Sequence, residues 1–580
     1  MARSPAVLRT LFRYIRPYWR QEVIGITALV LVNVLGVVIP LVLRRAINQL
    51  ETQPAWSTLA FHAFAIAGLA SLMWAIRMVS RLYLFGVGRQ VEFDLKQKLF
   101  EHFLRLDPQY FQDNPPGELI SRATSDVDNI RRLVGFSVLS LVNTVLAYGL
   151  TLPVMLSISV PLTLAALAAY PLLLLIVSLF GETLRQQQAQ VQERLAELSE
   201  LIQEDLSGMA LIKTYAQEDA ERQGFAQLNQ GLLRDNLALA RTRSFLFPLF
   251  GGIASVSLLL LLWLGSQALE SGQLRLGGLM ALLVYGERLI FPTALLGFTM
   301  TALQRGQVSI ARVESLLQEE PQIQDPPDPL PLPPVRGNIR VHHLTYTYPG
   351  QGEPALQDVS FSVQPGETVV IVGPVGAGKS TLLQALCRLL PIAPGQIFID
   401  GYDITQVRLA DLRRAIAYVP QESFLFSATI ADNIRYGQPD ADMGQVEGAA
   451  VQAHIHQEIL SFPQQYETLV GERGITLSGG QRQRTALARG LLVRASILLL
   501  DDVLASVDAQ TARLILQELR TLPQTILCVT HQLNVATIAD RVLVLHQGRL
   551  VQQGTHAELV AQPGLYRQLW ETYQLEQQFR

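Results

Sequence analysis

Gly373-Pro-Val-Gly-Ala-Gly-Lys379-Ser380 follows the apolar run 368–372 and precedes a helical pattern over residues 380–390. The spacing matches the G-x-x-x-x-G-K-[ST] phosphate-binding loop, in the strand–loop–helix context that this motif requires. The glycines allow the backbone to curl, so that successive N–H groups can point at phosphate oxygens. Lys379 adds a positive charge toward the β- and γ-phosphates, and the Ser380 hydroxyl can ligate Mg²⁺. The stretch therefore predicts a nucleotide site.

Two further motifs lie downstream of this loop. Ile497-Leu-Leu-Leu-Asp501 is an apolar run that ends in an acid, which places Asp501 where it can hold Mg²⁺ directly or through water. Leu477-Ser-Gly-Gly-Gln481 precedes a helical run over 482–493, so its N–H groups and the positive end of that helix form an anion site. A single nucleotide does not need two such sites from one chain.

The region from residue 337 to residue 580 alternates short β-rich runs with helical stretches. This pattern is typical of an α/β domain with a buried, largely parallel sheet, and the predicted strands are 368–372, 416–419, 497–500 and 526–529. Residues 321–336, PQIQDPPDPLPLPPVR, hold too much proline to continue a helix and predict a semi-rigid linker. We therefore expect three parts: 1–320, the linker 321–336, and 337–580.

Residues 1–320 contain long runs without charge. Three of them, 23–43, 56–76 and 244–269, have about the 20 residues that a helix needs to cross a bilayer. The uncharged run 133–181 is too long for one span, and Pro161 after Ser159 predicts the turn of a helical hairpin. A sixth span runs over about 277–303 and is interrupted by charges and Pro292. The sequence thus predicts six transmembrane helices.

The arginines predict the orientation of these spans. Residues 1–20 contain five arginines and no acid, which predicts a cytoplasmic N-terminus, and six spans then return the chain to the cytoplasm. The outer loops are short, with Arg44 and Arg45 as a mild exception. The inner connections, about 77–132 and 182–243, are long, charged and helical in period. We therefore expect the spanning helices to continue far into the cytoplasm.

The overall composition averages these two unlike halves. Of 580 residues, 49% are hydrophobic and 16% are charged, which excludes a disordered chain. The net charge of −3 excludes a globally basic nucleic-acid binder, so no nucleic-acid partner is expected. Two cysteines, Cys387 and Cys528, exclude a disulfide scaffold and are too few for a zinc cluster.

With its phosphate loop, its Asp501 strand and its Leu-Ser-Gly-Gly-Gln run after six predicted spans, the chain resembles the ABC transporter family. More narrowly, it is similar to an exporter half-transporter: an α-helical membrane domain followed by an α/β P-loop ATPase domain. The resemblance covers nearly the whole length. It implies an ATPase that uses ATP and Mg²⁺ to export a hydrophobic or amphipathic substrate across the cytoplasmic (inner) membrane, or to flip it from the inner to the outer leaflet.

The resemblance also implies roles for particular residues. In this family two ATPase domains meet head to tail, and the signature of one closes over the ATP held by the other. The Mg²⁺ contacts fall on Ser380, Gln421 and Asp501, and the loop before the signature contains Glu472. The expected nucleotide contacts are Tyr348 on adenine, Gly373, Pro374, Val375, Gly376, Ala377, Gly378, Lys379, Ser380 and Thr381, the switch His531 on the γ-phosphate, and the signature residues Ser478, Gly479, Gly480 and Gln481.

Two cytoplasmic segments also match the family. Residues 110–126 resemble the first coupling region and residues 208–218 the second. By this resemblance they are what the long inner helices present to the ATPase domains.

Asp502 departs from the family pattern, in which the residue after the Walker B aspartate is usually a glutamate that polarises the attacking water. Aspartate is one methylene shorter, and a misplacement of about 1 Å can cost on the order of 10²-fold in rate. The following Val503-Leu-Ala-Ser-Val-Asp508 also departs from the common Ala-Thr-Ser-Ala-Leu-Asp run. Both departures resemble the degenerate half of a heterodimeric exporter. We therefore hypothesise a heterodimer, with a homodimer that uses Asp502 as base as the alternative.

The substrate is not specified by the sequence. Charges at membrane depth are costly and often functional, so Arg77, Glu287 and Arg288 are candidate substrate contacts. As an alternative, Arg77 marks the inner boundary of its span. For Glu287 and Arg288, the alternative is mutual pairing or pairing with neighbouring helices. Hydrophobic drugs, lipids and peptides all remain open as substrates. The six predicted spans exclude a soluble ABC ATPase. An importer more often has its membrane and ATPase parts on separate chains. An ATP-gated channel or membrane regulator is a further alternative.

Overall fold

The structure is a computed structural model, and it describes residues 4–52, 56–168, 170–471 and 474–579. The chain divides into two compact units. The first runs up to Leu104 and resumes over Asn114–Glu319, and the second comprises Arg105–Asp113 and the chain from Glu320 onward. A short segment of the N-terminal half thus belongs to the C-terminal unit.

The first unit is helical. Its longest helix, α11, has 53 residues, which corresponds to about 80 Å at 1.5 Å per residue, whereas a bilayer core is about 30 Å thick. The helices therefore continue well past their apolar runs, as their periodicity predicts. They are α1 (Ser4–Ile15), α2 (Trp19–Thr52), α3 (Trp56–Phe103), α5 (Pro116–Ser121), α6 (Val127–Arg132), α7 (Val138–Ile158), α8 (Val160–Leu167), α9 (Tyr170–Ser207), α10 (Met209–Thr214), α11 (Glu218–Glu270) and α12 (Leu276–Leu317).

Several of these helices are apolar enough to cross a membrane. Within the described residues, four helical segments meet that condition, Arg9–Glu51, Trp56–Phe103, Pro116–Ile158 and Leu276–Leu317, and Ser255–Glu270 is a shorter apolar helix. The remaining expected span, in α9, contains side chains outside the described set. The chain is thus a multi-pass membrane protein, and the count of six spans stays a prediction.

The long uncharged run 133–181 breaks where the sequence predicts a turn. Ser159 has extended backbone angles, φ −163° and ψ 119°, between the end of α7 and the start of α8. Pro161 lies in the first turn of α8, where its missing N–H is tolerated. The break between two helices that the sequence predicts is found at this position.

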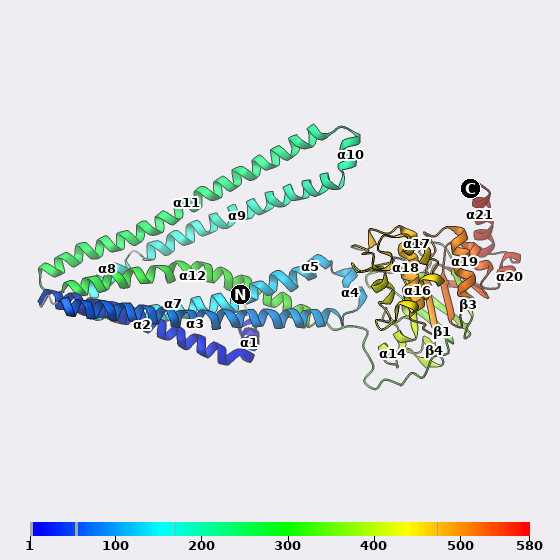
Figure 1. Ribbon diagram of the computed structural model, residues 1–580, viewed down its shortest axis with the longest axis horizontal. Helices are drawn as coiled ribbons and strands as arrows, with labels where there is room; N and C mark the ends of the chain where they lie inside the picture. The colour runs from blue at the N-terminus through cyan, green and yellow to red at the C-terminus, as the bar shows by residue number, and fades with distance from the viewer. Residues whose placement is uncertain (1–3, 53–55, 169, 472–473, 580) are drawn as a thin grey trace. The chain divides into compact units, whose positions relative to one another are not determined.

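Helices α9 and α11 lie side by side and form a second hairpin, with α10 at its tip (Figure 1). Three large apolar side chains in and beside α10 are exposed: Met209, Leu211 and Tyr215. The segment 208–218, which resembles a coupling region, is this tip.

Helix α12 packs against α2, α7 and α11, and its first turn approaches α2 very closely. A Cβ at Gly277 would lie 2.3 Å from the Arg44 carbonyl oxygen and 2.5 Å from Asn48 Oδ1. The Gly277 N–H donates to that same Asn48 Oδ1 at 3.1 Å, so the amide satisfies one of the free donors at the start of α12. Only glycine fits this contact without moving backbone.

The second unit contains two sheets. A four-stranded antiparallel sheet has the order β2-β1-β4-β5, and a six-stranded sheet has the order β10-β9-β3-β8-β7-β6, parallel except for β10. The strands are β1 (Ile339–Tyr346), β2 (Leu356–Val363), β3 (Thr368–Val372), β4 (Ile397–Ile399), β5 (Tyr402–Asp403), β6 (Ile416–Val419), β7 (Ile497–Asp501), β8 (Thr525–Val529), β9 (Arg541–His546) and β10 (Arg549–Gly554).

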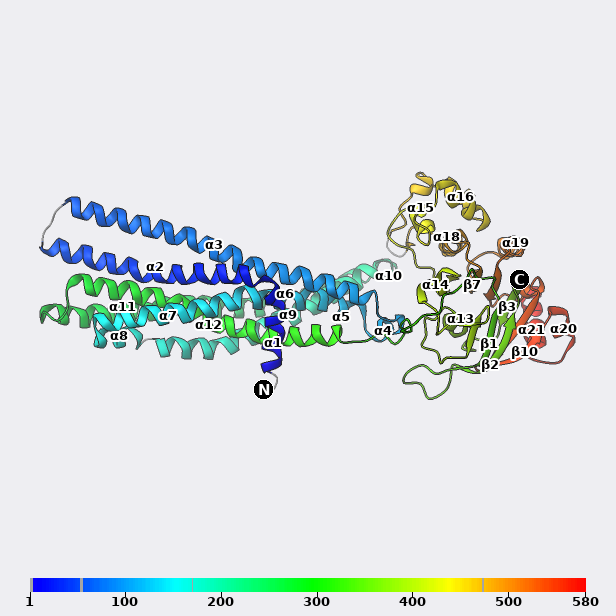
Figure 2. The same ribbon diagram turned by 90° about the horizontal axis from the view of Figure 1, so that it is seen from below.

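The four strands predicted from the sequence correspond to β3, β6, β7 and β8. Every residue of β3, β7 and β8 is buried, as expected of parallel strands covered on both faces. In Figure 2, α15, α16 and α18 gather together, apart from β1 and β2. The helices of this unit are α4 (Pro108–Asp113), α13 (Lys379–Leu386), α14 (Leu409–Arg414), α15 (Ile430–Arg435), α16 (Met443–Gln452), α17 (His456–Ser461), α18 (Gly479–Leu492), α19 (Ala509–Leu519), α20 (His556–Ala561) and α21 (Leu565–Phe579).

The proline-rich linker is attached to the second unit along its length. Asp107 Oδ2 accepts the Gln322 N–H at 2.6 Å, and the Arg388 guanidinium donates to the Gln324 carbonyl at 2.9 Å. Further along, the Leu330 N–H donates to the Gln406 carbonyl at 2.9 Å. The linker is therefore fixed on this unit and does not act as a free spacer.

We predict that Gly277→Ala destabilises the membrane unit. The added methyl must displace a backbone carbonyl, and overpacking of this kind costs about 1–3 kcal/mol. The midpoint temperature of helix loss in detergent, followed by circular dichroism of the full chain, should fall. Gly68→Ala is the matched control, because a Cβ at Gly68 meets nothing within 4 Å. Equal midpoints for the two variants would contradict the close approach.

Candidate nucleotide-binding site

The phosphate loop joins β3 to α13. Gly378 has φ +92° at the N-cap of α13, and a Cβ there would lie 2.5 Å from the Ala355 carbonyl oxygen. Gly376, at φ +79°, also occupies the left-handed region that glycine adopts at least cost. Around them, Ala377 and Thr381 are buried whereas Val375 is exposed. The loop thus folds as the spacing of its glycines predicts.

Lys379 is the first residue of α13 and is buried. Its ammonium donates to the carbonyls of Gly373 and Pro374, each at 2.8 Å, so it spans its own loop. Burial lowers the pKa of Lys379, while the charges of Asp502 and Asp501 act in the opposite direction. A desolvated cation held across the loop suits a polyphosphate, which supplies the missing negative charge.

Asp501, at the end of β7, lies against the start of α13. Its Oδ1 accepts the Ser380 hydroxyl at 2.9 Å, and its Oδ2 accepts the Tyr418 hydroxyl at 3.2 Å. Burial raises the pKa of Asp501, and these two hydrogen bonds oppose the shift. A hydroxyl and a carboxylate side by side form the hard oxygen pair that Mg²⁺ uses together with substrate phosphates. The residues therefore fit Mg²⁺.

Asp502 is buried and adopts a left-handed backbone, with φ +48°. Its N–H donates to the Val529 carbonyl at 2.9 Å, which ties it to the end of β8. Its Oδ1 accepts the backbone N–H of His531 at 3.4 Å. The two residues that the family pattern places at the γ-phosphate thus lie together, and the His531 residue is exposed.

The signature forms the start of α18. Ser478 caps the helix in a reciprocal capping box with Gln481, and Gln481 Nε2 also donates to Glu458 Oε2 at 2.9 Å. A Cβ at Gly480 would lie 2.8 Å from the Ser506 carbonyl oxygen, so the turn packs against the loop after Asp502. Across the described part of the chain, no hydrogen bond or ion pair joins Ser478–Gln481 to residues 373–381.

The remaining predicted nucleotide contacts are placed as follows. The Tyr348 ring packs edge-on against Tyr346 with 5.0 Å between centroids, and its hydroxyl lies 3.2 Å from Thr381 Oγ1. Tyr348 is thus near the phosphate-loop helix. Gln421 follows β6 and is exposed. Glu472 lies outside the described residues.

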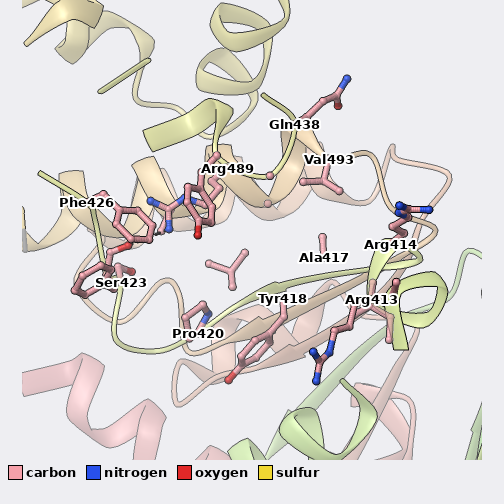
Figure 3. Close-up of a pocket in the computed structure, with 18 residues that line it drawn as sticks. Arg413, Arg414, Ala417, Tyr418, Pro420, Ser423, Phe426, Gln438, Arg489 and Val493 are labelled. Carbon is pink, nitrogen blue, oxygen red and sulfur yellow. Dashed lines mark hydrogen bonds between the residues drawn. The ribbon is translucent and has the colours of Figure 1, made fainter. Parts of the chain in front are cut away.

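Sequence reasoning missed a groove of about 730 Å³ that begins beside Tyr418 (Figure 3). The rings of Phe426 and Tyr436 stack in its wall at 4.5 Å, and the Arg489 guanidinium lies 5.6 Å from the Tyr436 ring centre. Phe424, Phe426 and Tyr436 are exposed. Three aromatic residues clustered after Gln421 were the available signal, but only the fold shows that they line one groove.

The three candidate substrate residues all belong to the first unit. Glu287 is exposed on α12, whereas Arg288 is half-buried and contacts Asn33 on α2. Arg77 on α3 is exposed and contacts the Met73 sulfur at 3.7 Å. The structure therefore separates Glu287 from the environment of Arg288.

Comparison with known proteins matches the chain to two family models, one in each half. The model of the ABC transporter transmembrane region matches residues 23–293, and the ABC transporter model matches residues 356–505. The probable multidrug resistance ABC transporter ATP-binding/permease protein YheI of Bacillus subtilis is 33% identical over 574 residues, 98% of each chain. The multidrug resistance-like ATP-binding protein MdlA of Escherichia coli is 33% identical over 97% of this chain and 96% of its own.

A solved structure also resembles the whole chain. The ATP-bound structure of a bacterial Atm1-family ABC exporter superposes with a TM-score of 0.76 and 26% identity. The match covers 95% of this chain and 98% of the other. The likeness therefore extends over both units.

We predict that Tyr418→Phe makes Mg²⁺-dependent nucleotide binding more sensitive to acid. Asp501 binds Mg²⁺ only when ionised, and its pKa is already raised by burial. Removing the hydrogen bond that favours the carboxylate raises that pKa further, so binding is lost at a higher pH as the pH falls.

The measurement is Mg²⁺-dependent binding of a fluorescent ATP analogue to the full chain between pH 5 and pH 8. Tyr466→Phe is the control, since that hydroxyl lies 2.7 Å from His456 and not from Asp501. An unchanged pH midpoint in Tyr418→Phe would contradict the assignment.

Proposed function

This chain belongs to the ABC transporter family, as an exporter-type half-transporter whose ATPase is coupled to transport, and from this premise we propose that it works as one half of a heterodimer. It moves a hydrophobic or amphipathic substrate outward across the cytoplasmic membrane, or from the inner to the outer leaflet. The N-terminus and the ATPase domain lie on the cytoplasmic side. The observation that supports the dimer is the separate placement of the phosphate loop and the signature within one chain.

In this proposal, each residue group has a distinct role at the nucleotide. Lys379 and the loop amides hold the β- and γ-phosphates, and Tyr348 stacks on adenine. Ser380, Gln421 and Asp501 would hold Mg²⁺, which would neutralise negative charge on the phosphates. His531 contacts the γ-phosphate. Ser478, with the free N–H groups at the start of α18, closes over the nucleotide of the partner chain.

Asp502 favours a heterodimer with two unequal nucleotide sites over a homodimer with two equal sites. Its carboxylate is one methylene shorter than glutamate, it is buried, and its Oδ1 faces the His531 backbone N–H. The Asp502 backbone has a left-handed conformation and donates its N–H to the Val529 carbonyl. This hydrogen bond opposes a backbone shift that would bring the short carboxylate closer to the attacking water. The site on this phosphate loop is thus weakly hydrolytic. The intact signature completes a competent site on the partner.

Two alternatives remain distinguishable by experiment. A homodimer would use Asp502 itself as the general base for export of lipids or drugs. An ATP-gated channel or membrane regulator would use the same nucleotide site without pumping. The substrate classes under test are small hydrophobic drugs, lipids and peptides.

We predict that the chain purified alone and reconstituted in lipid hydrolyses ATP slowly, and that Asp502→Asn changes this rate little. Asp502→Glu should raise the rate by about 10- to 100-fold, since it restores a carboxylate shifted by about 1 Å. Phosphate release measures the rate, with Lys379→Ala as the variant that abolishes it. A robust rate that collapses in Asp502→Asn would contradict the heterodimer.

The second measurement uses vesicles that contain this chain and a candidate partner with glutamate at the matching position. ATP-driven substrate uptake into inverted vesicles should require both chains and should be lost when Lys379 is replaced by Ala. Substrate flow down its gradient without ATP hydrolysis would favour the channel instead.

A further inference from the structure

An arginine at membrane depth fills a notch in a neighbouring helix. Arg288 lies 12 residues into α12, about 18 Å along the helix from Leu276. A Cβ at Gly36 of α2 would lie 1.5 Å from Arg288 Nη1 and 1.9 Å from Cζ. The guanidinium therefore occupies the volume that any larger side chain at position 36 would take.

Two asparagine side chains, Asn33 and Asn143, form a hydrogen-bonded pair next to this notch. Asn33 is 2% exposed, and its Nδ2 donates to the Leu29 carbonyl at 3.0 Å and to Asn143 Oδ1 at 3.1 Å. Its Oδ1 is therefore left as an acceptor, and Arg288 Nη2 lies 3.4 Å from it and 3.4 Å from the Asn33 carbonyl. The amide pair fixes where the guanidinium lies without neutralising it.

The positive charge has no acidic partner among the described residues. Both contacts of Arg288 are long and involve one nitrogen, although a guanidinium has five N–H donors. The adjacent Glu287 is exposed and points about 100° away around the helix. A cation with no counter-ion in an apolar setting is costly unless an anion joins it.

The position of Arg288 indicates that the anion has an apolar body. Arg288 lies within Leu276–Leu317, a helix apolar enough to cross a membrane, and Phe291 follows it by about one turn. An amphiphile can place its head group at Arg288 and its body among the apolar side chains, whereas a small inorganic anion would have to leave water completely.

We propose that Arg288, seated in the Gly36 notch on Asn33, is the binding site for an amphipathic anion, a molecule with one carboxylate, phosphate or sulfate head group. This rests on the proposed export function and specifies its substrate class. Asn33 and Asn143 are positioning residues, and Glu287 takes no part. Arg288 binds the head group through its fork of N–H donors.

The test is equilibrium binding of radiolabelled deoxycholate to the full chain in nanodiscs of phosphatidylcholine, without ATP. Arg288→Gln should weaken binding at least tenfold, and Arg288→Lys should weaken it less, since charge remains and the fork is lost. Gly36→Ala should weaken binding by displacing the guanidinium. The controls are Arg305→Gln, an exposed arginine on the same helix, and Gly149→Ala, where a Cβ meets nothing within 4 Å.

A neutral amide derivative of the same steroid separates head-group recognition from general apolar binding. Its affinity should not change in Arg288→Gln. Unchanged deoxycholate binding in both Arg288→Gln and Gly36→Ala would overturn the site, and so would equal loss for the acid and the amide. Retained binding of the neutral amide in each variant shows that the membrane unit, which holds Gly36 and Arg288, is folded.

Two further measurements are made. The first distinguishes a lipid head group from a soluble amphiphile, and the second separates the anion site from the export function. If phosphatidylglycerol added to the disc displaces deoxycholate from wild type, the site takes a lipid head group. If it does not, the site takes a soluble amphiphile, and both results uphold the anion site. Arg288-dependent binding together with absent ATP-driven transport would refute the export function and leave the site standing.

Discussion

The register of three parallel strands determines what the nucleotide-binding unit can do. Val529 of β8 lies opposite Ile371 of β3 on one side and opposite Asp501 of β7 on the other. The chain therefore leaves all three strands at one level, because parallel strands share a carboxyl edge. A slip of one residue would send the buried side chains of β7 to the opposite face and would part Asp501 from Ser380. The phosphate loop, the metal pair and the Asp502–His531 contact all depend on this alignment.

Much of this arrangement could be predicted from the sequence, because local signals determine it. The glycine spacing of the phosphate loop, the apolar run before Asp501 and the break at Ser159 each reflect a backbone rule that acts over a few residues. The roles of individual site residues, by contrast, came from resemblance. The hydrogen bond from Tyr418 to Asp501 was not foreseen, since it joins β6 to β7 across 83 residues.

The features that sequence reasoning missed are all long-range contacts. Gly36 has no motif, and its function as a notch appears only when α12 places Arg288 against it. Residues 321–336 form no helix, but proline content says nothing about the Arg388 and Asp107 contacts that attach this segment. Glu287 and Arg288 are neighbours in sequence, yet helix geometry gives them different environments. Contacts between helices, and not local helix propensity, give Glu287 and Arg288 their different environments.

The assignment of Arg105–Asp113 to the C-terminal unit has a consequence for biosynthesis. This segment leaves the ribosome about 200 residues before the part of the chain on which it packs. At about 5–20 residues per second, the delay is on the order of 10–40 s. Throughout that interval, Asp107 and α4 are without their packing partners, while the later membrane helices are being inserted. Maturation of this transporter therefore requires a late docking step, and during that interval the nascent chain is open to chaperones and proteases.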